Sequence, residues 1–94
     1  MAMVEINDLK IDGYELDKSF FSDDKAVEYT SVASEDDFIH IIETVNLTME
    51  NEPVLVVSFF FGCSRVETLV FNSVVEREFL EKTIKETILK YERA

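Results

Sequence analysis

The stretch VLVVSFFFGC, residues 54–63, constrains the fold more than any other part of the sequence. Successive side chains of a β-strand point to opposite faces of a sheet, so a strand over Val54–Phe61 carries apolar side chains on both faces. A sheet with one face in water needs only one apolar face. Two interpretations stay open: the N-terminal segment covers the second face, or that face is a binding interface.

Turn signals predict the strands around this stretch. The short connection Gly62-Cys63-Ser64 predicts an antiparallel hairpin between that strand and a second strand over Arg65–Phe71. The Asp12-Gly13 pair predicts another hairpin within residues 9–16, because a type I′ turn needs positive φ at both central residues. Residues 26–33 are rich in β-formers and predict one more strand.

Two segments have the features of helices. Ser34 is a suitable N-cap, and the acidic residues that follow it stand where the first turn has free N–H groups. Apolar residues then recur at helical spacing, at Phe38, Ile41, Ile42, Val45 and Met49. Ser73 and Glu76 form a capping box before a second stripe, which consists of Val75, Phe79, Leu80, Ile84, Ile88 and Tyr91.

These elements predict a single acidic α+β domain over residues 1–94. The expected order is ββ-β-α-β-β-α, with a mostly antiparallel sheet of about five strands and two helices on one face. A hydrophobic content of 47% with 2 Gly and 1 Pro excludes a disordered chain. The start MAMVEINDLK lacks the features of a signal peptide, and no apolar stretch reaches the roughly 20 residues of a membrane helix, so we expect a cytoplasmic protein.

The charge is distributed unevenly. Residues 1–52 hold fourteen acidic and three basic residues, whereas residues 53–94 hold six of each, so the net charge of -11 lies in the first half. Nucleic acid and anionic membranes would be repelled by this half, since binding them needs Lys and Arg. A basic protein would be attracted. The acidity equally serves solubility, and the sequence does not choose between these roles.

No residue pattern indicates a reaction or a cofactor. Cys63 is the one candidate nucleophile, with Arg65 the sole nearby cation in the sequence, and the single histidine, His40, falls on the far side of the first predicted helix. One Cys and one His cannot form a structural zinc site. The spacing of acids around Gly13 does not match a calcium loop, since Lys10 and Ser19 occupy ligand positions. We therefore expect no catalytic residues, no metal and no cofactor.

The sequence thus favours a non-catalytic binding protein. The leading hypothesis is an inhibitor that occludes a basic nuclease or nucleic-acid-binding partner, with the acidic half imitating phosphate charge and aromatic residues anchoring the contact. Immunity proteins, antitoxin-like inhibitors and phage anti-defence inhibitors share this composition and size. The alternative is a self-associating structural or chaperone-like module that dimerises through its apolar sheet face. The expected partner-binding residues are Asp23, Asp24, Glu28, Glu35, Asp36, Asp37, Phe60, Val66 and Val70.

Overall fold

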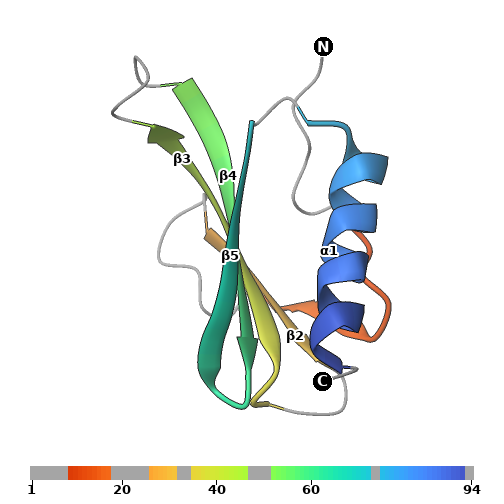
Figure 1. Ribbon diagram of the computed structural model, residues 1–94. Helices are drawn as coiled ribbons and strands as arrows, with labels where there is room; N and C mark the ends of the chain where they lie inside the picture. Colours follow the sequence, from red (N-terminus) through yellow and green to blue (C-terminus); the bar gives the residue numbers. More distant parts are fainter. Residues whose placement is uncertain (1–8, 18–25, 32–34, 47–51, 73–74, 93–94) are drawn as a thin grey trace.

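A computed structural model describes residues 9–17, 26–31, 35–46, 52–72 and 75–92. The described part holds five strands followed by one helix, in an α+β arrangement (Figure 1). Their bounds are β1 Tyr14–Asp17, β2 Ala26–Ser31, β3 Phe38–Asn46, β4 Glu52–Phe61, β5 Ser64–Asn72 and α1 Arg77–Glu92. The strands form one antiparallel sheet in the order β1-β2-β3-β4-β5, so each strand pairs with its neighbour in the chain.

The hairpin predicted from the apolar stretch is confirmed. β4 and β5 pair along their lengths, and Phe61 pairs with Ser64, which leaves a two-residue turn of Gly62 and Cys63. Both turn residues have positive φ, of 63° and 65°, as a type I′ turn requires. A change of register between Phe59 and Phe60 marks a β-bulge farther along the pair.

The prediction of a helix that begins at Ser34 is wrong. Residues 38–46 form β3, which pairs with β2 on one side and with β4 on the other. Five of the nine residues, Ile39, Ile41, Ile42, Thr44 and Val45, are β-branched and favour strand geometry. The helical spacing was misleading because both faces of this strand are apolar, so its apolar residues do not alternate strictly. Only one helix, α1, occurs among the described residues, where two were expected.

The N-terminal hairpin is also wrong as predicted. The chain does turn at Asp12 and Gly13, where the Tyr14 N–H donates to the Ile11 carbonyl oxygen over 3.0 Å. Strand β1, however, begins only after this turn and pairs with β2. Leu9 and Ile11 are buried in the same core as the helix, so the described N-terminal residues do not cover the second face of the sheet.

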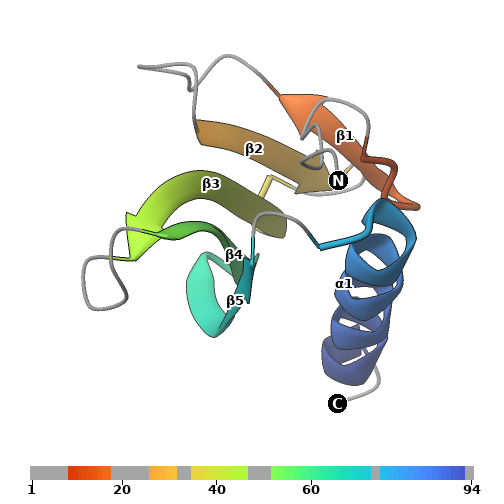
Figure 2. The ribbon, with the colours of Figure 1, turned by 90° about the horizontal axis from the view of Figure 1, so that it is seen from above.

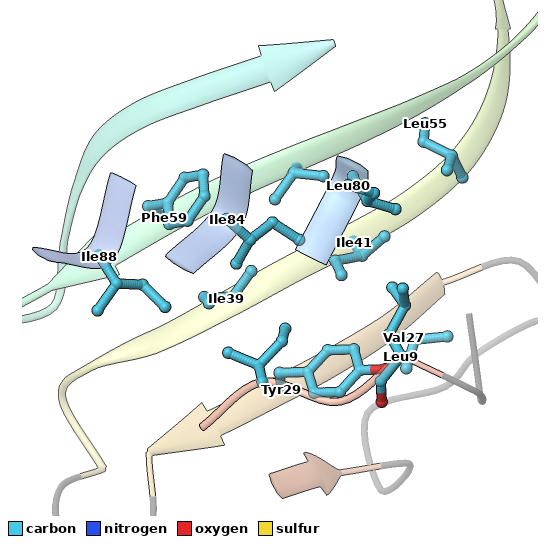
Figure 3. Packing of buried hydrophobic residues seen from close by; sticks show 12 residues of the cluster. Leu9, Val27, Tyr29, Ile39, Ile41, Leu55, Phe59, Leu80, Ile84 and Ile88 are labelled. Atoms are coloured by element: carbon cyan, nitrogen blue, oxygen red, sulfur yellow. The ribbon is translucent and has the colours of Figure 1, made fainter. Parts of the chain in front are cut away.

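The core lies between α1 and one face of the sheet (Figure 2). Leu80, Ile84 and Ile88 project from the helix toward the buried side chains of the sheet (Figure 3). Every second residue of β2, β3 and β4 contributes to this core, because successive side chains of a strand point to opposite faces. The buried sheet residues are Val27, Tyr29, Ile39, Ile41, Leu55, Val57 and Phe59. The Tyr29 hydroxyl donates to the Leu9 carbonyl oxygen over 3.3 Å, which ties the N-terminal segment to the core.

We predict that Ile84→Ala lowers the free energy of unfolding by about 2–5 kcal/mol, because it removes a fully buried side chain and leaves a cavity. Urea unfolding followed by circular dichroism measures this change. Leu89→Ala, which shortens a side chain 39% exposed on the same helix, is the matched control and should cost less than about 1 kcal/mol. Equal losses for the two variants would contradict the packing described here.

Candidate protein-binding face

The side of the sheet turned away from α1 is the strongest candidate for a functional site. We call it the outer face. The described helix packs on the opposite face, and strand register places the side chains of the outer face in rows that cross the strands. Its described members are Glu15 of β1, Glu28 and Thr30 of β2, Phe38, His40 and Ile42 of β3, Val54, Val56, Ser58 and Phe60 of β4, and Arg65, Thr68, Val70 and Asn72 of β5.

Apolar side chains occupy two regions of the outer face, on either side of a polar row formed by His40, Ser58 and Thr68. The rings of Phe38 and Phe60 stack with centroids 4.5 Å apart and an interplanar angle of 11°. Ile42 and Val56 form the next apolar pair across the same two strands, and Val70 extends it onto β5, where it is 63% exposed. Phe60 is half-buried by its neighbours within the sheet, with the Arg65 guanidinium 6.0 Å from its ring centroid. Aromatic residues of this kind are enriched at protein interfaces.

The two sides of the outer face carry charges of opposite sign. Glu15 and Glu28 lie on the two strands at one side of the sheet, and Arg65 lies on the opposite edge strand. Glu15 and Arg65 are exposed, whereas Glu28 is half-buried. The outer face therefore combines two apolar rows with carboxylates on one side and a guanidinium on the other, which makes it a candidate protein-binding surface.

The structure brings together only some of the residues expected to bind a partner. Glu28, Phe60 and Val70 lie on the outer face, and Val66, 37% exposed, lies at the bulge beside it. Glu35 is exposed in the segment between β2 and β3. Asp23 and Asp24 lie outside the described residues.

Asp36 and Asp37 have a different position from the one expected, because the helix that they were to begin is absent. They contact the β4–β5 turn. The Gly62 N–H donates to Asp37 Oδ1 over 2.9 Å, and the Cys63 N–H donates to the Asp36 carbonyl oxygen over 2.9 Å. The Cys63 thiol donates to Asp36 Oδ1 over 3.0 Å. These bonds hold the tip of the hairpin against the segment that enters β3.

The same contacts act against thiol reactivity. The hydrogen bond to Asp36 raises the pKa of Cys63 above its ordinary value, and the nearby carboxylates add to this effect. The nearest partner is thus an anion, the opposite of the positive environment that activates a cysteine. His40 does not compensate, since it pairs with Ser58 in register. Roughly 10 Å of strand separates Ser58 from Phe61, and Cys63 lies beyond that residue.

We predict that iodoacetamide alkylates Cys63 of the folded chain more slowly than Cys63 of the chain unfolded in urea, at about pH 8. Asp36→Asn should raise the folded rate, because the neutral amide no longer opposes the thiolate. Glu35→Gln removes a neighbouring charge without touching the thiol bond and is the control. A folded thiol that reacts faster than the unfolded one would contradict this assignment.

The turn end of the β4–β5 hairpin is also tied to the C-terminal end of α1. The Tyr91 hydroxyl donates to Glu67 Oε1 over 2.6 Å, and Lys90 Nζ lies 3.0 Å from the same oxygen. The rings of Phe61 and Tyr91 are 5.7 Å apart. The hydrogen bond from Tyr91, followed by that from Lys90, lowers the pKa of Glu67 below its ordinary value. This cluster belongs to the helix side of the sheet and leaves the outer face open.

Because the folded pKa of Glu67 is lowered, its ionised form stabilises the fold above the ordinary carboxyl pKa, and this contribution is lost as pH falls through the lowered value. We predict that Glu67→Gln lowers the free energy of unfolding at pH 7 and that the difference from the wild type shrinks from about pH 4.5 downward. Urea unfolding over this pH range measures it. Tyr91→Phe should show the same convergence, and a constant difference at all pH values would contradict the assignment.

Other features of the described chain point to no ligand. A shallow groove of about 360 Å³ runs between residues 10–12 and α1, but its carboxylates already have partners: the Lys10 backbone N–H donates to Glu81 Oε2 over 2.7 Å, and Lys85 pairs with Asp12 at 3.7 Å. In the described ranges, no three His, Cys, Asp or Glu side chains group as a metal site would require. The helix that the structure describes is not long and apolar enough to cross a membrane.

Sequence reasoning missed several residues of the outer face, namely Glu15, Phe38, Ile42 and Arg65. Phe38 and Ile42 were assigned to a helix, and Glu15 to the wrong hairpin. The β-branched composition of β3 was the available signal for the first error. Nothing local indicated that Glu15 and Arg65 end the same row, because that follows from the pairing of all five strands.

Comparison of the chain with protein families, with curated proteins and with solved structures finds no match.

Proposed function

We propose that this chain is a non-catalytic, acidic protein-binding module that occludes a basic partner through its outer face. The observation that carries the proposal is the composition of that face: stacked aromatic rings in one row, Ile42, Val56 and the exposed Val70 in another, and carboxylates of β1 and β2 at one side. The apolar side chains supply the contact, and the acidic side supplies the preference for a basic protein.

The net charge supports a basic partner over nucleic acid. A chain of net charge -11 repels phosphates and accelerates the approach of a positively charged protein. The partner class that fits is a nuclease or another nucleic-acid-binding protein, whose phosphate-binding surface the carboxylates would occupy. The mode of action resembles that of immunity proteins, antitoxin-like inhibitors and phage anti-defence inhibitors, and the proposal places the protein in the cytoplasm.

Capture at two ionic strengths tests this function. The immobilised chain should retain a basic protein from a lysate of its source cells at about 50 mM NaCl and release it at about 500 mM, because salt screens the steering charges. The captured protein, once purified, should bind the Val70→Asp variant at least about 10-fold more weakly in calorimetry, since the substitution puts a charge among the apolar side chains of the outer face.

Leu89→Asp is the matched control, because it places the same charge at an exposed apolar position on the helix, away from the outer face. It should leave the affinity unchanged. Binding that is insensitive to salt, or that Val70→Asp and Leu89→Asp weaken equally, would refute the proposed function. A partner of acidic or neutral charge would do the same.

A further inference from the structure

We infer that, without a partner, the outer face binds a second copy of this chain in a two-fold, face-to-face dimer centred on β3. The inference concerns the surface on which the proposed function rests, and it makes the dimer a competing, resting state of that surface. Among the described residues no helix covers this face, one row of its side chains has opposite charges at its two ends, and its area suits a weak dimer.

One row crosses the whole sheet. Register pairs Glu15 with Thr30, Thr30 with Phe38, Phe38 with Phe60 and Phe60 with Arg65. The row therefore runs from an anion on one edge strand, through two stacked rings, to a cation on the other edge strand. When a second copy of the row is laid over the first in the opposite direction, each end therefore meets a charge of opposite sign.

A two-fold axis parallel to the strands and running along β3 reverses the row across the interface. Such an axis places β1 of one copy over β5 of the other, so Glu15 of each copy meets Arg65 of its partner. Phe38 and Ile42, both on β3, then lie near the axis and meet their own counterparts. This is an isologous contact, in which the same patch serves both copies. Aligned packing of two sheets at about 10 Å is the geometry of a β-sandwich.

The area of the face suits a weak dimer. The strands lie about 4.8 Å apart and carry outward side chains about 7 Å apart, in four rows of which β1 reaches two and β2 three, so the face spans on the order of 600 Å² on each copy. Stable interfaces bury about 800 Å² on each partner, and specific ones begin near 600 Å². The chain's net charge of -11 further opposes tight self-association. A dimer of this strength gives way to a partner of opposite charge, so self-association and partner binding exclude each other.

Analytical ultracentrifugation of the full chain up to about 200 µM, in about 150 mM NaCl, tests the dimer. The wild type should sediment as a monomer–dimer equilibrium. Arg65→Glu and Glu15→Arg should each weaken dimerisation at least about 10-fold, because each brings like charges together twice in the dimer. Both substituted positions are exposed, so the monomer should keep its fold and its circular dichroism spectrum.

Mixing the two single variants is the decisive arm. In a mixed dimer each reversed side chain meets an opposite charge on the other copy, so the mixture should dimerise like the wild type although neither variant does so alone. The double variant on one chain should also recover. A wild type that stays monomeric, single variants that dimerise normally, or a mixture that stays as weak as its components would each overturn the dimer.

The outcomes separate this inference from the proposed function. A monomer that captures a basic partner in a Val70-dependent manner overturns the dimer alone. A dimer rescued by charge exchange that captures no basic partner supports the dimer and overturns the proposed function. Added partner should dissociate the wild-type dimer, and a complex in which the chain stays dimeric would contradict the competition between the two states.

Discussion

The structure depends on the burial of one sheet face beneath a single helix. Leu80, Ile84 and Ile88 of α1 occupy the centre of that face, and residues 9–11 close the core beside the helix. Burying apolar surface of this kind is the main favourable contribution to folding. The helix is held at its C-terminal end by the Tyr91–Glu67 hydrogen bond, so the hairpin β4–β5 and α1 form one connected unit.

Because α1, the one helix among the described residues, packs on this face, no described helix is left to cover the outer face. A small domain normally turns polar side chains to water on such a face. Here stacked Phe38 and Phe60 occupy one row, and Ile42, Val56 and Val70 occupy another beyond the polar row of His40, Ser58 and Thr68. These apolar residues contribute nothing to the helix-side core, and the proposed contact with another protein would account for them.

The acidic residues divide into two groups with different physical roles. Asp36 and Asp37 bind the N–H groups of the β4–β5 turn, where Cys63 adopts the positive φ that residues other than glycine rarely take. Their charge is part of the fold's own hydrogen bonding. Glu15 instead is exposed on the outer face, where its charge acts on what approaches. Counting acids along the chain cannot separate these groups, because the separation depends on which turn lies next to residues 36 and 37.

Much of the fold was predictable from local pattern. The hairpin around Gly62-Cys63, the strand at 26–31 and the C-terminal helix follow from turn chemistry and periodicity, although the helix begins at Arg77 and not at the predicted capping box. The concentration of negative charge in residues 1–52 follows from a count of the residues. Tertiary structure alone decided that residues 38–46 form a strand, because pairing with β2 and β4 outweighs their helical spacing. It also decided that no described element covers the second face of β4, because α1 packs on the opposite face. Glu15 and Arg65 share a row because four successive strand pairings fix the register from β1 to β5.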